Sequence, residues 1–238
     1  MINFKFKTSE RKDGPMNLLA DKEKHWKSLE IDLERISNRA QFLSNNFGIK
    51  NNQSVIPKLQ HGSVIESVER SNFGIAELPC DGLITTKKGL ALTVTAGDCY
   101  PVMIYCPEIE VICLLHVGWR GLADKIVEKA IMKLYSEFGC YLKDMHVQVG
   151  PGICRKCYEV GPEVFKAFGY GHVHSKMNFN LLNEIEGQAA IIPPRNIHFN
   201  SCDHPCTYHQ DEYFSARRDG KIGGIPNYQF AVAIMQNE

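Results

Sequence analysis

The chain has 238 residues and a formal net charge of zero, because 27 Lys and Arg balance 27 Asp and Glu. This balance lacks the basic excess of a general nucleic-acid-binding protein, so a small molecule is the favoured partner. Hydrophobic residues make up 44% and charged residues 23% of the chain, which is ordinary for a folded globular protein and argues against disorder and membrane insertion. We expect no nucleic-acid or membrane partner, and nothing indicates an obligate protein partner.

The first predicted element is a strand over residues 1–7, where apolar and polar side chains alternate. This segment lacks the continuous apolar stretch of a signal peptide or a membrane span, so we expect a cytoplasmic protein. A helix is predicted over about residues 21–47, with apolar side chains in steps of three and four and Gly48 as its stop. The same pattern predicts a second helix over residues 122–138, ending at Gly139.

Short β-branched or aromatic runs between these helices predict the strands of one buried sheet, over residues 63–68, 82–86, 90–95, 102–105 and 111–115. Two later runs continue it, over residues 145–149 and 230–235, and a short helix is predicted from Gly161 onward. The mixed order of helices and strands predicts an α/β fold. We expect a single layered α/β domain spanning residues 1–238, with a mixed sheet core flanked by helices.

Three residues near predicted strand ends form the main candidate site: His61, Cys99 and His116, each within two residues of a Gly or Asp in an apolar context. Two imidazoles and a thiolate leave a fourth tetrahedral position for water or substrate, as in catalytic zinc sites. Copper accepts the same ligands, so the donor set alone leaves the metal open. Each residue also has a plain alternative as a buried core side chain. A further alternative is a metal-independent cysteine hydrolase, with Cys99 as nucleophile and His116 as its base.

An anion site is predicted beside His116, because the helix that follows begins near Arg120, whose guanidinium would favour a bound anion. Nine cysteines are an odd number, and several lie in apolar runs, so a complete disulfide framework is not expected. Two further clusters could be structural metal sites or redox pairs. They are Cys154 with Cys157, and Cys202 with His204, Cys206 and His209.

Several strings of the sequence resemble the YfiH-like, laccase-domain family, also called the polyphenol oxidase or purine nucleoside phosphorylase family. They are Leu59–Gly62, Cys80–Thr85, Gly97–Val102, His116–Gly121, Gly150–Ile153, Tyr158–Gly161, Cys206–Thr207 and Phe214–Gly220. The chain departs from the family's pattern at Leu59, Ala96-Gly97, Ala216 and Gly224. The substrate contacts of the family are therefore not carried over.

This resemblance implies zinc bound by His61, Cys99 and His116. It implies phosphorolysis of adenosine, inosine and S-methyl-5'-thioadenosine to the free base and a ribose 1-phosphate sugar, with adenosine deaminase as a second activity. Copper-dependent polyphenol oxidation is the alternative behind the older family name. Catalytic roles are expected for Cys99, His116 and Arg120.

Supporting roles are expected for four further charged residues. We expect phosphate binding by Arg120 together with Arg217 or Arg218, because guanidinium groups bind phosphate through charge-assisted hydrogen bonds. Asp81 and Glu159 are candidates for acid/base chemistry or for orienting a metal ligand.

Overall fold

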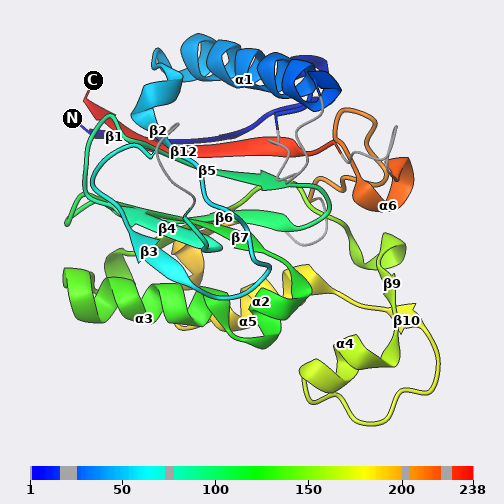
Figure 1. Ribbon diagram of the computed structural model, residues 1–238. Helices are drawn as coiled ribbons and strands as arrows, with labels where there is room; N and C mark the ends of the chain where they lie inside the picture. The colour runs from blue at the N-terminus through cyan, green and yellow to red at the C-terminus, as the bar shows by residue number, and fades with distance from the viewer. Residues whose placement is uncertain (1, 17–25, 73–77, 200–203, 221–226, 238) are drawn as a thin grey trace.

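The computed structural model describes residues 2–16, 26–72, 78–199, 204–220 and 227–237, and it stacks a helix, two facing sheets and a second group of helices (Figure 1). Helix α1 (Trp26–Phe47) covers a four-stranded sheet. The order of its strands is β1 (Ile2–Thr8), β12 (Gln229–Asn237), β5 (Ala91–Ala96) and β2 (Ser54–Val55). The order in the six-stranded sheet is β11 (Ile197–His198), β8 (His146–Val149), β6 (Tyr100–Cys106), β7 (Val111–Val117), β4 (Gly82–Thr85) and β3 (Ile65–Ser67).

The remaining elements are helices that cover the six-stranded sheet, and short helices, strands and turns in the connecting segments. Its outer face is covered by α2 (Trp119–Ala123), α3 (Ile126–Phe138) and α5 (Leu181–Ala189). The smaller elements are α4 (Pro162–Ala167), α6 (Ala216–Asp219) and the paired strands β9 (Glu159–Val160) and β10 (Met177–Asn178). The 3-10 turns are η1 (Arg11–Asp13), η2 (Asn51–Gln53), η3 (Leu142–Asp144), η4 (Arg155–Cys157) and η5 (Pro194–Asn196).

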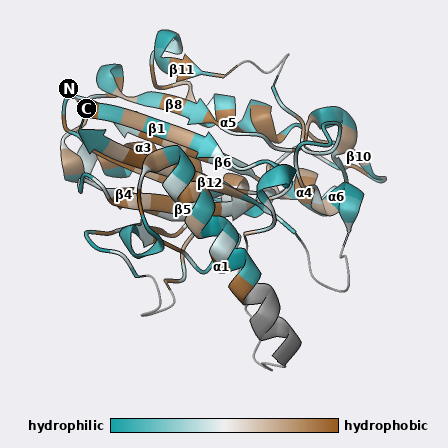
Figure 2. Cartoon of the chain, turned by 90° about the horizontal axis from the view of Figure 1, so that it is seen from above, coloured by the Kyte–Doolittle hydropathy of each residue, from teal (hydrophilic) through white to brown (hydrophobic). Residues whose placement is uncertain are grey.

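Burial of the sheets explains their apolar sequences. Every residue of β7 is buried, because one face of the strand packs on α3 and the other faces the four-stranded sheet. A strand buried on both faces reads as a continuous apolar run rather than as an alternation. Figure 2 shows the same result from above, with brown apolar segments along the central strands and teal segments toward the outside. The predicted α/β class with helices flanking a sheet core is confirmed.

The expectation of one sheet is wrong, because β5 lies in the four-stranded sheet while β4, β6 and β7 lie in the other. The chain therefore crosses between the sheets at Gly97–Cys99, directly between β5 and β6. A continuous apolar run predicts a buried strand but does not specify its partners, since pairing here is set by contacts between distant segments. The crossing matters for function because it carries Cys99.

The second predicted helix is two helices. Residues 119–123 form α2, and α3 begins at Ile126 after Lys125 adopts a left-handed conformation with φ 59°. The apolar spacing continues across this break, so the pattern alone reads as one helix. The predicted ends are confirmed at Gly139, with φ 74°, and at Gly48, with φ 67°. The predicted start of the first helix lies outside the described residues.

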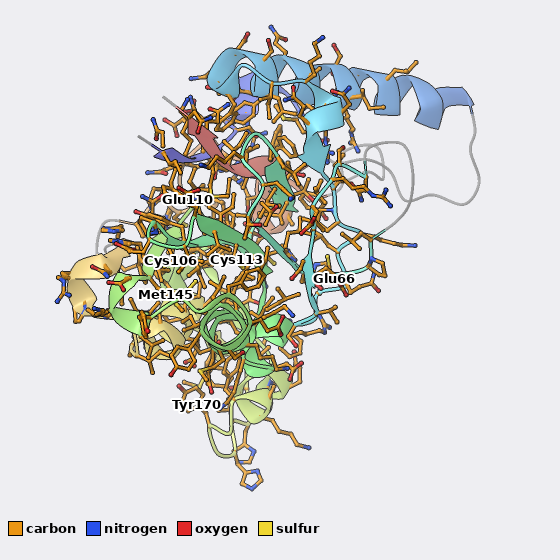
Figure 3. All side chains as sticks on the ribbon, turned by 90° about the vertical axis from the view of Figure 1, so that its left-hand side faces the viewer. Glu66, Cys106, Glu110, Cys113, Met145 and Tyr170 are labelled. Carbon is orange, nitrogen blue, oxygen red and sulfur yellow. The ribbon has the colours of Figure 1, made fainter. Side chains whose placement is uncertain are left out.

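Several cysteines serve the core. Cys106 and Cys113 have no exposed surface and lie on β6 and β7 in the six-stranded sheet (Figure 3). Burial raises the pKa of both thiols, so they remain neutral and pack as small hydrophobic side chains. Among the helices of the described chain, none is long and apolar enough to cross a membrane.

Candidate active site

Strand ends at one edge of the six-stranded sheet bring the three predicted ligands together. His116 is the penultimate residue of β7, Cys99 immediately precedes β6, and His61 lies in the loop before β3. One ligand atom from each residue lies within 4.8 Å of the other two. The two imidazole rings are perpendicular, with centroids 4.9 Å apart. His116 is buried, Cys99 is half-buried and His61 is exposed, so the set opens to solvent on one side.

Asp81 holds this set in place from the start of β4. Its carboxylate is fully buried and accepts a hydrogen bond from Nδ1 of His116 at 2.9 Å. It also accepts the backbone N–H groups of Gln60, His61 and Gly62 at 3.1, 2.9 and 2.8 Å. Because an ionised carboxylate only accepts, Nδ1 of His116 carries a proton, which leaves Nε2 as the ring nitrogen that faces the other two residues and could bind a metal. Asp81 thus orients one imidazole directly and the loop of the other through its backbone.

The backbone around the ligands is tightly constrained. His61 has φ 57°, an uncommon left-handed conformation for a residue with a side chain, and the three N–H bonds to Asp81 hold it there. A Cβ atom on Gly118 would lie 2.9 Å from Sγ of Cys99, and one on Gly121 would lie 2.6 Å from the carbonyl oxygen of Gly62. These two glycines therefore give α2 the close approach that the site requires.

Electrostatics differ between the two imidazoles. Burial lowers the pKa of His116, but the neighbouring Cys99 sulfur and the bond to Asp81 outweigh it and raise the value to about 9. Burial, and then the nearby His116, lower the pKa of His61 below its ordinary value. For Asp81, burial raises the pKa, but the hydrogen bonds from His116 and the 61–62 backbone outweigh burial and lower it. Asp81 is therefore a carboxylate across the neutral pH range.

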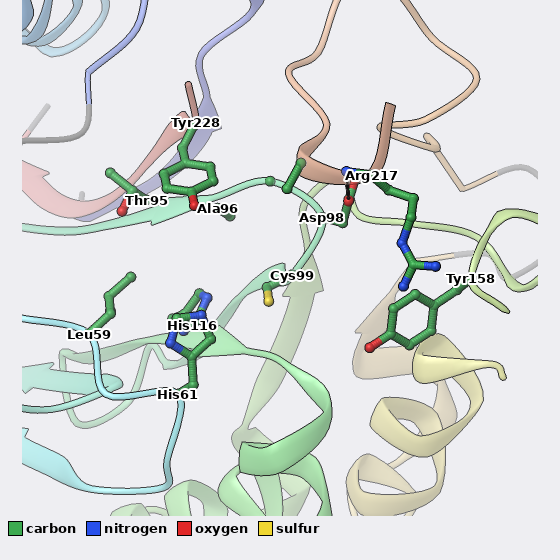
Figure 4. Close-up of a pocket in the computed structure, with 12 residues that line it drawn as sticks. Leu59, His61, Thr95, Ala96, Asp98, Cys99, His116, Tyr158, Arg217 and Tyr228 are labelled. Carbon is green, nitrogen blue, oxygen red and sulfur yellow. Dashed lines mark hydrogen bonds between the residues drawn. The ribbon is translucent and has the colours of Figure 1, made fainter. Parts of the chain in front are cut away.

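A cavity of about 390 Å³ adjoins the three ligands. In Figure 4 the two imidazoles lie on one side of Cys99, and Arg217 and Tyr158 lie on the other, with Tyr228 opposite the imidazoles. The lining residues are Leu59, His61, Thr95, Ala96, Gly97, Asp98, Cys99, His116, Tyr158, Ala216, Arg217 and Tyr228. Its volume lies within the range of small-molecule sites, roughly 300–1,000 Å³.

Arg217 is the predicted phosphate ligand that the structure brings to this cavity. One guanidinium N–H donates to the carbonyl oxygen of Glu159 at 2.7 Å, and the group lies 5.3 Å from the centre of the Tyr158 ring. The Arg217 backbone N–H donates to Asp98 at 2.8 Å, and Asp98 also accepts from Thr207 at 2.8 Å. Asp98 thereby joins the Cys99 loop to the start of α6.

The structure does not bring the other predicted residues to the cavity wall. Arg218 points away and donates to Asp219 and to the carbonyl oxygens of residues 207, 208, 210 and 213, so its guanidinium is committed to the protein itself. Arg120 is exposed on α2, with its guanidinium 4.3 Å from the centre of the Trp119 ring. Glu159 is exposed on β9, and it is its carbonyl oxygen that contacts Arg217.

Four lining residues had no role predicted from the sequence: Thr95, Asp98, Tyr158 and Tyr228. Burial raises the pKa of Tyr158 to about 12 and also raises that of Tyr228, so both phenols are neutral. Asp98 and Tyr158 lie within segments that resemble the family, so the sequence did hold a signal for these two. Tyr228 reaches the cavity because β12 pairs with β5, with Gln229 opposite Ala96, a long-range pairing that no local pattern reveals.

The chain matches a known protein family over most of its length. Residues 25–229 match the family described as multi-copper polyphenol oxidoreductase laccase. The chain belongs to this family. The chain is 28% identical over 225 residues to a purine nucleoside phosphorylase of Clostridium acetobutylicum. The aligned segment covers 92% of this chain and 93% of that protein. The chain is 29% identical over 161 residues to an adenosine deaminase from an unknown prokaryotic organism, covering 60% of this chain and 59% of that one.

The fold of this laccase-family chain is also found in a solved structure. The crystal structure of the hypothetical protein YfiH of Bacillus licheniformis matches it with a TM-score of 0.80 at 20% sequence identity, over 98% of this chain and 92% of that one. The predicted family is confirmed by the match over residues 25–229 and by this fold.

Proposed function

We propose that the protein is a zinc-dependent purine nucleoside phosphorylase with adenosine deaminase activity, acting on adenosine, inosine and S-methyl-5'-thioadenosine. One observation carries this proposal: His61, Cys99 and His116, which could hold a metal ion, line the same cavity as Arg217, whose guanidinium could bind phosphate. The names of the two curated relatives support both activities. These names and the family resemblance support the proposal, and product analysis and metal analysis would test it.

The residues present fit a zinc ion. His61, Cys99 and His116 supply two nitrogen atoms and one sulfur atom within 4.8 Å of one another. Donors on one tetrahedral zinc ion stand about 3.5 Å apart, so small side-chain movements suffice. Asp81 fixes the proton of His116 on Nδ1 and leaves Nε2 for the metal, as is common for metal-binding histidines. A bound zinc ion supplies Lewis acidity and lowers the pKa of bound water.

The chain's own residues would do the positioning. Arg217 binds the phosphate that attacks C1' of the ribose, since its planar N–H groups match phosphate oxygens. Asp98 and Glu159 hold Arg217 through its backbone and its guanidinium, which limits the freedom lost on binding. The bond from C1' to the base would break as the bond from C1' to an oxygen of dihydrogen phosphate forms, and the base would leave with the proton that the phosphate gives up.

The tyrosines would bind the nucleoside. Tyr158 and Tyr228 flank the cavity as neutral phenols, and aromatic faces stack on purine rings, typically by about 1–3 kcal/mol for each base. Burial keeps their hydroxyl groups protonated, so each also offers a hydrogen-bond donor. A cavity lined by two aromatic rings and a guanidinium suits a ligand with a flat base and an anionic partner.

The experiment is product analysis of adenosine incubated with and without phosphate. Adenine that appears only with phosphate indicates phosphorolysis, and inosine that appears in either case indicates deamination. Cys99→Ala is the control, because it removes the sulfur ligand. If wild-type protein gives no adenine, hypoxanthine or inosine above this control, the proposal is wrong.

Arg217→Gln tests the phosphate site, with Arg218→Gln as its matched control. We expect Arg217→Gln to raise KM for phosphate at least tenfold and to leave the deamination rate within about twofold, because water needs no guanidinium. Arg218→Gln should instead lower the unfolding free energy, since its donors hold four backbone carbonyl groups. Equal phosphate KM values for wild-type and Arg217→Gln would remove Arg217 from the mechanism.

A second candidate is a cysteine hydrolase. Without metal, His116 lies against Cys99 and is oriented by Asp81, which is the order of a nucleophile, a base and an orienting carboxylate. Metal analysis combined with thiol alkylation separates the two functions. Stoichiometric zinc that protects Cys99 from alkylation excludes the hydrolase. Copper-dependent phenol oxidation, the alternative suggested by the family's description, requires oxidation of a phenol by copper-loaded protein that Cys99→Ala abolishes.

A further inference from the structure

Two loops beside the cavity carry a second group of metal-binding side chains. Cys154 caps the start of η4, and Cys157 is the last residue of η4. Cys206 and His209 lie in the turn before α6. The loops are joined by a parallel backbone bridge between Gly152 and Cys206. This bridge places a Cys-x-x-Cys segment against a Cys-x-x-His segment.

The four side chains converge on one point. One ligand atom from each residue lies within 4.8 Å of the other three. Nδ1 of His209 lies 3.7 Å from Sγ of Cys154 and 3.7 Å from Sγ of Cys157. Donors on a tetrahedral zinc ion have separations of about 3.5 Å. These spacings are therefore close to those of a bound ion.

The backbone around Cys206 is arranged to support a thiolate. The N–H of Cys154 donates to Sγ of Cys206 at 3.3 Å, so the two loops are also joined through this sulfur. Hydrogen bonds from backbone N–H groups stabilise the charged form of an acceptor. A sulfur that accepts a backbone N–H and faces Cys154, Cys157 and His209 is placed as a metal ligand rather than as a packing group.

We propose a second metal site, a closed structural Zn²⁺ centre, held by Cys154, Cys157, Cys206 and His209. Three thiolates and an imidazole favour Zn²⁺, and two ligand pairs each spaced by two residues are typical of structural zinc. All four positions come from the protein, so none remains for substrate. Three thiolates around Zn²⁺ leave one negative charge, which Arg155 and Lys156, between the first two ligands in sequence, help to offset.

This assignment revises the clusters expected from sequence. His204 is not a ligand, because its Nε2 lies 2.7 Å from the carbonyl oxygen of Gly150. Cys202 lies outside the described residues. Cys206 and His209 instead complete the Cys154 and Cys157 pair, from a loop about fifty residues further along the chain.

The second site would fix one wall of the cavity. Cys157 directly precedes Tyr158, which lines the cavity, and Cys206 directly precedes Thr207, which donates to Asp98 at 2.8 Å. Asp98 in turn accepts the N–H of Arg217 and precedes Cys99 in sequence. Loss of this metal would thus loosen the positions of Tyr158 and Arg217 without removing any ligand of the first site. This consequence rests on the proposed function, but the metal site itself does not.

The test is zinc content, measured per chain on protein purified under reducing conditions and washed with a mild chelator. Wild-type protein should hold two zinc ions. The double variant Cys157→Ser with His209→Ala should hold one, and so should the single variant Cys99→Ala. The triple variant that combines these changes should hold none. Cys140→Ala with His174→Ala is the matched control, also one cysteine and one histidine, and should hold two. A wild-type protein with a single ion that Cys99→Ala removes overturns the proposal, as does a Cys157 and His209 double variant that keeps both ions.

Cobalt substitution gives a second measurement if the double variant does not fold. The Cys99→Ala protein, freed of zinc and loaded with Co²⁺, should show visible bands of tetrahedral cobalt and a strong sulfur-to-cobalt absorption from three thiolates. Weak octahedral bands, or a Cys154 to Cys157 disulfide in freshly purified reduced protein, would show that the cluster is not a metal site. Since Cys99→Ala lacks the proposed activity, these results are independent of whether the nucleoside chemistry is right.

Discussion

Asp81→Asn is the change that bears most directly on the candidate active site. The substitution keeps the size of the side chain but replaces one oxygen with an NH₂ group, which donates and cannot accept. Oδ2 accepts from the backbone of Gln60 and Gly62, and Oδ1 accepts from the backbone of His61 and from Nδ1 of His116. Whichever oxygen is replaced, two donors face another donor in a fully buried position.

The magnitude follows from these two lost bonds. A buried donor left without an acceptor costs about 1–3 kcal/mol, so the unfolding free energy should fall by about 2–6 kcal/mol. If the NH₂ group faces His116, the imidazole can accept at Nδ1 only by moving its proton to Nε2, which then cannot bind metal. If it faces the loop, His61 loses the support for its left-handed conformation. Loss of such supporting hydrogen bonds typically lowers metal affinity 10–100-fold, the range expected here.

The assay combines zinc competition against a chelator with urea unfolding of the metal-free protein. Asp124→Asn is the matched control, because the Asp124 side chain is 64% exposed and its ion pair with Lys129 contributes about 1 kcal/mol or less. The reasoning fails if Asp81→Asn binds zinc as tightly as wild-type protein. It also fails if the metal-free variant unfolds within 1 kcal/mol of wild-type protein, since the four hydrogen bonds would then contribute nothing.

Two further changes test other parts of the structure. Gly118→Ala should weaken zinc binding in the chelator assay, because its Cβ atom would lie 2.9 Å from Sγ of Cys99, whereas the helical control Gly187→Ala, with open space around it, should not. Burial opposes ionisation of Asp219, but Arg218 and other donors outweigh it and lower the pKa from 3.8 to about 2. Stability from this carboxylate is therefore present above about pH 4 and lost as the pH falls toward 2. Unfolding measured against pH should show that Asp219→Asn lowers stability at neutral pH by about 2 kcal/mol and removes that acid-dependent loss.

The sequence predicted the parts of the fold that depend on local pattern. Helix stops at Gly48 and Gly139 require a left-handed residue, and glycine supplies it most readily, so the residue type itself marks the end. The assignment of β5 and β6 to different sheets has no such mark. Both are continuous apolar runs, and their partners are chosen by packing of segments far apart in sequence, β12 for one and β7 for the other.

The same distinction holds for the candidate site. His61, Cys99 and His116 could be grouped because each stands in a recognisable string, and the structure brings them together. The sequence did not show that Arg217 reaches the cavity while Arg218 donates to carbonyl oxygens of its own chain. Both are arginines in one short helix, and only the directions of their side chains differ. The grouping of two distant loops into a Cys₃His cluster was equally out of reach, since it requires their pairing.

The departures from the family's pattern are concentrated at the cavity. Leu59, Ala96, Gly97 and Ala216 all differ from the residues usual in the family, and all four line the cavity. The fifth departure, Gly224, lies outside the described residues. Since His61, Cys99, His116 and Asp81 keep the residue types that the resemblance implies, the variation falls on surfaces that would touch a nucleoside rather than on groups that would hold a metal. The proposed reaction type therefore rests on groups whose residue types match the resemblance, whereas under that proposal the preference among nucleosides would be set by the chain's own cavity walls.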